Sequence, residues 1–538
     1  MAPLPLDYIS PLPPVRSGIS DYSVDLLPHL ESRCDLRVLR LPGQAVSEEV
    51  EKRWHPQPAL EALEAQQEEV EPGENPRLPV YHMGNNLHHA AVADLAESFP
   101  GVLVLHDLVL HHLLMERTLA HGELDPYLHR LEADHGLLGR AVAWARRWGA
   151  YSDASLFALP AHRSLLLAQR GVLVHSQWAA EMLRDEEPAL AVRVIPMGVP
   201  LPPAADEDQR AVFRQRLGLP EHSVVLGSFG FQTPIKRTEK AVEMLAQPGL
   251  EEAHLLIVGQ ASEASDLLAE ARRGGVAERV HVTGFLPYGE FESAIAATDL
   301  CLNLRYPTAG ETSASLLRVL AMGRPAIVSD FAQSAELPSR IAVKVLLGTE
   351  EVAALAAAVK QLLGAPEKLQ AMGRAARSYV AEVHDPGKAA ESLVEACREL
   401  APLSPLQATC APPEVPSTLT WGAVRGGFEV AGADLPWPPG ERRELSLTVT
   451  NQGSSRWLAG PAGAGGVVFQ VELLSAGEDL LRDRPWIPLP VALEPGESRR
   501  LTVPIRRPPG AAQLKIAGHV LGAAGFEALG GQNWEQAL

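Results

Sequence analysis

The sequence predicts an α/β protein with two facing, doubly wound Rossmann-like domains, followed by a C-terminal all-β sandwich. Up to about residue 400, short apolar runs alternate with helical patterns, as in a parallel sheet covered by helices. Beyond residue 420 the apolar residues recur at every second position, the period of half-buried strands. We therefore expect domains at 1–202, 203–400 and 421–538, with a linker at 401–420.

Charge, hydropathy and cysteine spacing limit which partners and which cellular compartment we expect for this protein. The 538 residues carry a formal net charge of −19. A protein that binds nucleic acid needs a basic face, so this charge argues against a nucleic-acid partner. No apolar run approaches the roughly 18 residues of a membrane span, and the N-terminus lacks the pattern of a signal peptide. The four cysteines, Cys34, Cys301, Cys397 and Cys410, match no disulfide or metal spacing. The cytoplasm is therefore the expected compartment.

Three loops of the first half follow apolar runs and carry polar or glycine residues. The loop SPLPPVRSGISDY, at residues 10–22, contains Gly18, which would let the backbone approach a ligand, although a glycine needed only for a turn is equally common. Asn85 and Asn86 end the second run, and VLVLHD places His106 and Asp107 at the end of the third. Ligand-facing groups of open α/β sheets lie at such strand ends, so we expect all of these near a ligand.

Histidines are frequent in this region, and a metal site has to be weighed. His82, His88, His89, His111 and His112 show no H-E-x-x-H or comparable spacing. Single core or helix-start histidines are the commoner explanation, so we expect no metal and no organic cofactor. The first loop has no G-x-G-x-x-G fingerprint, and the sequence has no Walker motif. Both absences argue against an oxidoreductase with a dinucleotide cofactor and against a P-loop protein.

The second half holds the clearest candidate for an anion site. LNLRYPTAGETSASLLRVLAMGRPAIVSD, residues 302–330, reads as strand, loop, helix, turn and strand, and the N–H groups at the start of such a helix can hold a phosphate. Lys236 and Arg237 follow another apolar run directly. Positive charge is unfavourable near a helix N-terminus unless an anion is present, so this pair also indicates phosphate, with a solvated helix start as the alternative.

Three other segments bear on organisation. The Pro-rich acidic stretch at 200–210 reads as a hinge between the two α/β domains. A helix between Tyr127 and Trp148 carries four arginines and Trp144; a packed domain helix is the favoured interpretation and peripheral contact with an anionic membrane the alternative. In the sandwich, Trp457 and Trp486 are expected in the core, whereas exposure would favour carbohydrate platforms.

Six motifs follow one another along the chain: SPLPPVRSGISDY, the His106-Asp107 pair, GFQTPIKR, VTGFLP, ATDL and GETSASLLRVLAMGRPAIVSD. Taken together, they resemble the motifs of the retaining glycosyltransferases of family 4, which have the GT-B fold. The resemblance covers about residues 1 to 400, and the C-terminal sandwich loosely resembles an immunoglobulin-like module. It implies transfer of a sugar, with retention, from a nucleotide-diphosphate sugar to a carbohydrate, lipid-linked or other glycan acceptor, without a metal. An epimerase of the same fold matches the motifs less well.

The resemblance also assigns residues. Lys236 and Arg237 fall where family members bind the donor diphosphate, Gly18 lies on the loop that closes over it, and His106 falls beside the transferred sugar. We expect His106 and Glu311 to be the catalytic residues, which orient and polarise this sugar. The base is expected at Gly284, Phe285 and Leu286. Gly310 and Thr312 are also expected to bind the donor, on the loop that leads to the N–H groups of Ser313, Ala314 and Ser315, which would cap the phosphate.

Two departures from the family pattern stand out. The family carries two glutamates eight positions apart, and these places hold Gly310 and Arg318 here. Glu311 is adjacent to the first and is expected to take over its contact with the sugar, whereas Arg318 is either a cation of the donor site or a salt-bridged helix residue. Phe231 replaces an arginine, for which Arg237 is the expected substitute. A nucleotide-sugar or glycan-binding protein with a degenerate transferase core remains the alternative function.

Overall fold

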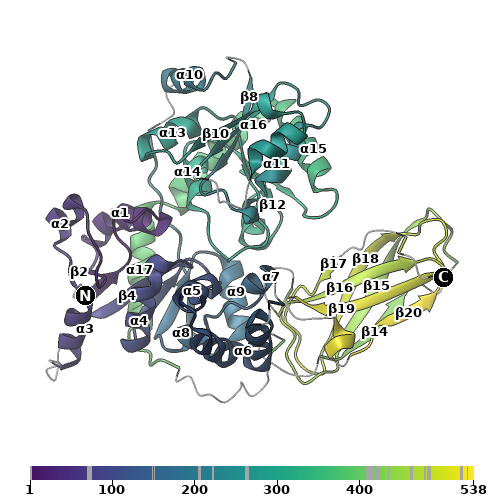
Figure 1. The fold of residues 1–538 in the computed structure, drawn as a ribbon, viewed down its shortest axis with the longest axis horizontal. Helices are drawn as coiled ribbons and strands as arrows, with labels where there is room; N and C mark the ends of the chain where they lie inside the picture. The colour runs from purple at the N-terminus through teal and green to yellow at the C-terminus, as the bar shows by residue number, and fades with distance from the viewer. Residues whose placement is uncertain are drawn as a thin grey trace.

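The protein consists of two α/β domains and a β-sandwich, which confirms the predicted fold class (Figure 1). Most of the predicted linker, with Trp148 and Cys410, lies outside the part of the chain that the structure describes. The computed structural model describes residues 3–68, 76–147, 149–150, 152–203, 207–220, 223–260, 266–406, 417–418, 424–433, 436–460, 465–477, 480–481, 486–521, 525–529 and 531–538.

The first domain is built on a parallel sheet in the order β3-β2-β1-β4-β5-β6-β7. Its central strands are apolar runs with both faces buried, because helices cover the sheet on both sides. The strands are β1 (Pro5–Ile9), β2 (Asp35–Arg40), β3 (Gln57–Pro58), β4 (Leu78–Met83), β5 (Val102–Leu105), β6 (Gly171–Val174) and β7 (Val192–Val194).

Helices connect these strands. At the N-caps of α1 and α9 a serine accepts a hydrogen bond from a backbone N–H of the first turn, Ser17 from Ser20 at 3.1 Å and Ser176 from Ala179 at 3.2 Å. The helices are α1 (Gly18–Leu30), α2 (Glu48–Trp54), α3 (Ala59–Glu68), α4 (Ala90–Ser98), α5 (His111–Arg117), α6 (Leu124–Arg147), α7 (Ala154–Ala158), α8 (Arg163–Leu167) and α9 (Gln177–Glu186).

The second domain repeats this architecture with the parallel order β10-β9-β8-β11-β12-β13. Its strands are β8 (Val224–Phe229), β9 (Ala253–Val258), β10 (Val280–Gly284), β11 (Leu300–Asn303), β12 (Ala326–Ser329) and β13 (Ala342–Val345). Its helices are α10 (Glu207–Arg216), α11 (Thr238–Leu245), α12 (Leu267–Arg273), α13 (Tyr288–Ala296), α14 (Ala314–Ala321), α15 (Glu351–Leu363) and α16 (Pro366–Val383).

The last helix of the predicted second domain, α17 (Pro386–Leu400), crosses back to the first domain. In Figure 1 it lies in green among the purple and blue elements, beside α1. Leu400 packs so closely on Gly171 of β6 that a Cβ at Gly171 would lie 2.6 Å from it. The second domain was expected to extend to residue 400. In the structure α17 packs on the first domain and completes it.

The two α/β domains touch each other beside the ends of their strands. The N–H of Val109 donates to the carbonyl of Ala309 at 3.0 Å. Gly310 has a left-handed φ of 83°, and a Cβ there would lie 2.7 Å from Leu108, so this approach requires glycine. On a second loop, the Glu336 carboxylate accepts the N–H of Gln177 at the start of α9 at 3.2 Å.

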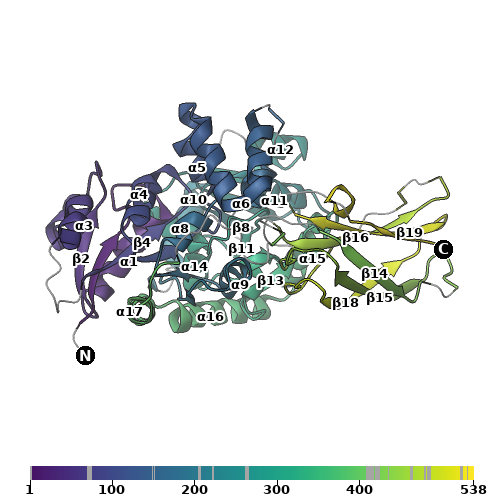
Figure 2. The ribbon, with the colours of Figure 1, turned by 90° about the horizontal axis from the view of Figure 1, so that it is seen from below.

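The C-terminal domain packs two antiparallel sheets around one apolar core, with the orders β14-β15-β18 and β17-β16-β19-β20. Figure 2 shows it extending from one end of the molecule, opposite the N-terminus. The four predicted alternating segments are all strands. The strands are β14 (Gly426–Ala431), β15 (Arg442–Asn451), β16 (Val467–Leu474), β17 (Trp486–Pro488), β18 (Ser498–Arg506), β19 (Gln513–Val520) and β20 (Trp534–Ala537).

The two tryptophans of the sandwich have opposite environments. Trp457 is fully buried, as expected. The expectation for Trp486 was wrong: it is 52% exposed because β17 is a short edge strand, and its ring lies 5.1 Å from that of His519. Exposure is the condition under which a carbohydrate platform was favoured. The sandwich also contacts the first domain, where Leu458 packs with Ala158 and Leu159.

The arginine-rich helix predicted between residues 127 and 148 is α6, with a kink at Gly136. Arg130 pairs with the carboxylate of Glu97, and the guanidinium of Arg147 lies 5.3 Å from the ring of the exposed Trp144. Among the described residues no helix is long and apolar enough to cross a membrane.

Candidate functional site

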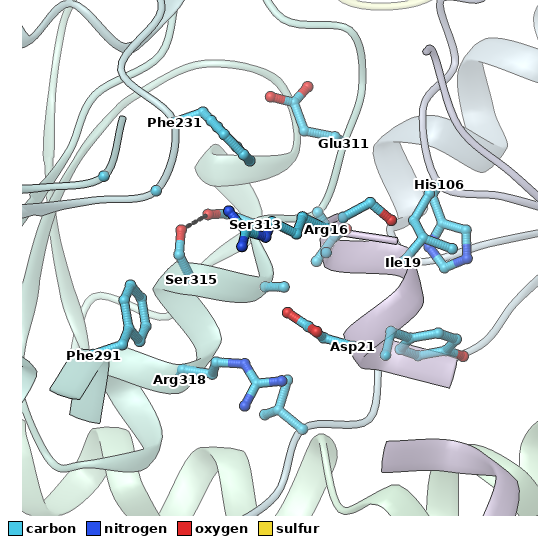
Figure 3. Close-up of a pocket in the computed structure, with 18 of the residues that line it drawn as sticks. Arg16, Ile19, Asp21, His106, Phe231, Phe291, Glu311, Ser313, Ser315 and Arg318 are labelled. Atoms are coloured by element: carbon cyan, nitrogen blue, oxygen red, sulfur yellow. Dashed lines mark hydrogen bonds between the residues drawn. The ribbon is translucent and has the colours of Figure 1, made fainter. Parts of the chain in front are cut away.

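A cavity of about 620 Å³ lies where the carboxyl ends of both parallel sheets face each other. One wall is formed by the loop at 13–19 and the start of α1, and by His106 and Asp107 after β5. The opposite wall is formed by the loops after β8, β9, β10 and β11 and by the start of α14. Figure 3 shows these two walls and the side chains between them.

The start of α14 presents an anion-binding surface to this cavity. Ser313 is the N-cap, and its hydroxyl accepts the N–H of Leu316 at 3.3 Å. The hydroxyls of Ser313 and Ser315 lie 3.2 Å apart and both line the cavity (Figure 3). The free N–H groups of the first turn and the positive end of the helix dipole therefore face the space that a ligand would fill.

Lys236 supplies a cation beside this helix. It ends a short 3-10 helix, Pro234–Lys236, and its ammonium donates to the carbonyl of Phe229 at the end of β8. Gly230 makes room for it: φ there is 91°, and a Cβ would lie 2.6 Å from Nζ. Burial, and next the nearby Arg305 guanidinium, lower the pKa of Lys236 to about 7. An anion in the cavity would favour the charged form.

Arg305 and Glu311, both on the loop that precedes α14, form a largely buried ion pair. The second guanidinium nitrogen of Arg305 donates to Ser313 Oγ at 3.2 Å. The Glu311 carboxylate also accepts from Thr308 Oγ1 at 3.1 Å and from the N–H of Ala309 at 3.0 Å. Glu311 is thus held in a fixed orientation while still lining the cavity.

Asp107 lies opposite Glu311, on the first domain. Its carboxylate accepts the N–H of Asn85 at 2.8 Å. Burial, and next the charge of Glu311, raise the pKa of Asp107 to about 7, against the effect of the Asn85 N–H. Near neutral pH this carboxyl is therefore divided between an acceptor and a hydrogen-bond donor.

His106 belongs to a row of three imidazoles, of which those of His82 and His106 are buried. The carbonyl of Ile195 can only accept, so His175 Nδ1 donates to it at 3.2 Å and His175 Nε2 accepts from His106 Nδ1 at 3.2 Å. His106 Nε2 then accepts from His82 Nδ1 at 3.1 Å. Burial lowers the pKa of all three. Both nitrogens of His106 are engaged with other imidazoles, which argues against the expected role of this ring in polarising a sugar.

Arg318 lies farther along α14 and reaches across the cavity. Its guanidinium is 2.7 Å from the Asp25 carboxylate of α1, so the salt-bridge alternative describes it, although both residues also line the cavity. Burial raises the pKa of Asp25 and of neighbouring Asp21, and Arg318 opposes both shifts. In Figure 3 Asp21 and Arg318 lie on facing walls.

Aromatic rings border the cavity on the second domain. Phe285 and Phe231 are 51% and 53% exposed, which is unusual for phenylalanine and leaves their faces available for stacking. The guanidinium of Arg16, from the loop of the first domain, lies 5.1 Å from the centre of the Phe285 ring. Leu286 lines the cavity beside Phe285.

Twelve of the sixteen predicted site residues line this one cavity. Four do not. Asn85 turns its amide toward His112 and the N–H of Leu113. Arg237, in left-handed conformation at φ 51°, pairs with the buried Glu351. Gly284 stays in the sheet through a 2.9 Å bond from the N–H of Gly259, and Gly310 packs on Leu108. The residues brought together are Gly18, Asn86, His106, Asp107, Lys236, Phe285, Leu286, Glu311, Thr312, Ser313, Ala314 and Ser315.

The residues that the sequence-based prediction missed are charged groups on the two walls. Arg16 and Asp21 lie within the loop segment that was singled out, but only Gly18 was selected there. Arg305 directly follows the apolar run of β11, a strand-end position that gave a usable signal. Asp25 has no such signal, because only the facing domain brings it to the cavity. Among the described residues no group of three or more His, Cys, Asp or Glu side chains could hold a metal ion.

Comparisons with known proteins show that the chain is similar to glycosyltransferases. Residues 223–365 match the family model described as Glycosyl transferases group 1. The 2-deoxystreptamine glucosyltransferase of Streptomyces kanamyceticus is 27% identical over 224 residues, which are 39% of this chain and 56% of that protein. The D-inositol 3-phosphate glycosyltransferase of Segniliparus rotundus is 30% identical over 197 residues, 34% of this chain and 42% of that protein. The chain thus spans about half the length of these curated relatives.

Solved structures extend the likeness to both α/β domains. Sucrose-phosphate synthase from Thermosynechococcus elongatus gives a TM-score of 0.51 at 18% identity and covers 74% of this chain and 99% of its own. The Anabaena protein HepE in complex with UDP and glucose gives 0.50 at 16% identity, over 73% of this chain and 99% of its own. At these identities the likeness concerns the fold. The chain therefore has the GT-B fold of glycosyltransferases, and its second domain matches glycosyl transferases group 1.

Proposed function

We propose that this protein is a retaining glycosyltransferase that moves a sugar from a nucleotide-diphosphate sugar to a glycan or other hydroxyl acceptor. The observation that carries the proposal is the cavity between the two sheets, where Lys236 and the start of α14 face an exposed aromatic rim. This arrangement offers charge and N–H donors to a diphosphate and a stacking surface to a base. HepE, which has the same fold, forms a complex with UDP, and this supports a nucleotide as the ligand.

The proposed reaction needs stabilisation of the departing diphosphate. The bond between the anomeric carbon and the diphosphate oxygen breaks, and a bond from that carbon to an acceptor oxygen forms. Lys236 and the N–H groups of Ala314 and Ser315 would balance the negative charge left on the diphosphate. This set of donors supports a reaction without a metal.

The acceptor is proposed to attack on the face from which the diphosphate leaves, so the configuration is retained. Its proton then passes to the departing diphosphate oxygen, and no protein nucleophile is required. Two opposed carboxylates, as in a glycosidase, would serve a different reaction. Glu311 and Asp107 do line the same cavity, but Glu311 is neutralised by Arg305, which favours a positioning role for it.

At the sugar end, we assign Glu311 to the hydroxyl groups of the transferred sugar. Its carboxylate is fixed by Arg305, Thr308 and Ala309, so it can accept from a hydroxyl without first losing side-chain freedom. Asp107 faces it and would contact either the sugar or the acceptor. His106, whose nitrogens are engaged with other imidazoles, would shape the wall.

Transfer from a panel of radiolabelled UDP- and GDP-sugars to mixed glycan and lipid-linked acceptors tests the proposal. A labelled product whose anomeric proton shows the same configuration as the donor by NMR is expected. An inverted product would overturn retention. A protein that binds a donor but releases no sugar, even to water, would instead be the non-catalytic binding protein.

A further inference from the structure

The charges that line the cavity are unequally paired. Arg305 is neutralised by Glu311, and Arg318 lies 2.7 Å from Asp25. Lys236 donates to a backbone carbonyl, and its pKa of about 7 leaves it partly uncharged at neutral pH. Arg305 and Arg318 are therefore already paired with carboxylates, and a ligand with at least two negative charges would need a further cation besides Lys236.

Arg16 differs from the other arginines of the cavity. It is exposed, and within the described part of the chain no carboxylate forms an ion pair with it. Its guanidinium lies over the ring of Phe285, 5.1 Å from the ring centre, on the opposite domain. A planar guanidinium is suited to bidentate binding of phosphate oxygens, and it keeps its charge at any pH used in an assay.

Arg16 lies on a loop that faces the same part of the cavity as the start of α14. It directly precedes Ser17, the N-cap of α1, and residues 13–19 all line the cavity. In Figure 3 Arg16 extends from this loop into the pocket, toward the wall that carries Ser313 and Ser315. An anion held by the first turn of α14 would therefore be approached from the first domain by a cation that Phe285 has already oriented.

We propose that Arg16 binds the diphosphate of the donor from the first domain, so that the nucleotide bridges both domains across the cleft. This inference rests on the proposed function, since it concerns the same donor. Besides Lys236, the diphosphate would then have a second cation, Arg16. This residue lies outside the domain that matches the glycosyltransferase family model. The proposal also gives the Arg16–Phe285 contact a role: the ring holds the guanidinium beside the site while no donor is bound.

The test is isothermal titration of the full-length protein with UDP-glucose, GDP-mannose, UDP and GDP, and with the nucleosides uridine and guanosine. For the diphosphate that binds, Arg16→Ala is expected to raise Kd by about tenfold or more, with partial recovery in Arg16→Lys. Affinity for the matching nucleoside should change by less than about twofold, because no phosphate is present. Unchanged thermal unfolding would show that the variant folds.

Arg53→Ala is the matched control. Arg53 also lies over an aromatic ring, that of Trp54 at 4.8 Å, on the same domain, but it does not line the cavity. Unaltered diphosphate binding is expected for it.

Three outcomes would overturn the inference. If Lys236→Met weakens diphosphate binding and Arg16→Ala does not, Arg16 has no part in the site and the donor proposal stands. If Arg16→Ala weakens nucleoside and diphosphate binding equally, the residue acts on the base. If the wild type binds none of the diphosphates, both this inference and the proposed function fail.

Discussion

Lys236 makes donor binding dependent on pH in a direction that the structure specifies. Its pKa is lowered to about 7, chiefly by burial and next by Arg305. A bound diphosphate stabilises the ammonium, so binding above pH 7 must take up a proton and weakens as the pH rises. The protonated fraction of free Lys236 falls from about one half at pH 7 to about 3% at pH 8.5, which predicts a roughly 15-fold rise in Kd.

Titration calorimetry with a nucleotide-diphosphate sugar measures this directly. Repeating each titration in two buffers with different ionisation enthalpies gives the proton uptake, expected to rise from about 0.5 at pH 7 toward one at pH 8.5. A sugar nucleotide is the suitable ligand because its phosphates are already fully ionised at these values. Binding should be tightest at the low end of the range.

Lys236→Arg is the control, because guanidinium keeps its proton throughout. Its binding is expected to lose the pH dependence. Asp107 also titrates near pH 7, so any dependence that remains in Lys236→Arg should disappear when Asp107→Asn is added. If the wild type shows no proton uptake, or if Lys236→Arg has the same pH profile as the wild type, the role given to Lys236 is wrong.

Three further predictions follow from the contacts of single residues. Glu311→Gln is expected to lower transfer turnover about tenfold or more with nucleotide affinity nearly unchanged; equal turnover would refute its contact with the sugar. Arg318→Ala leaves Asp25 unpaired and should reduce the free energy of unfolding by roughly 1–3 kcal/mol, with partial recovery in combination with Asp25→Asn, as measured by chemical denaturation. Trp457→Ala should destabilise the sandwich by roughly 3–5 kcal/mol and Trp486→Ala by less than about 0.5 kcal/mol; similar losses would contradict their burial.

The sequence predicted the sheets because buried parallel strands leave a strong local pattern. VLVL and GVLV are apolar on both faces, as β5 and β6 are in the structure. The sequence of α17 does not indicate on which sheet this helix packs, because its periodicity predicts only an amphipathic helix. Edge strands such as β3, with two residues, are too short to show a period.

The site was predictable where a residue follows a strand directly. Lys236 and Asp107 were found in this way, Ser313 was assigned from the resemblance, and all three line the cavity. Arg237 was misplaced because its left-handed backbone and the buried Glu351 turn its side chain away, and neither is visible in local sequence. Contacts between the two domains depend on tertiary packing for the same reason.

A crystal structure of the full-length protein with a bound nucleotide-diphosphate sugar tests the central claim most directly. We expect the diphosphate between Lys236 and the first turn of α14, with Arg16 reaching it from the other wall and the base against Phe285. The sugar should lie between Glu311 and Asp107. A nucleotide bound elsewhere, or one whose phosphates point away from Ser313, would contradict the account.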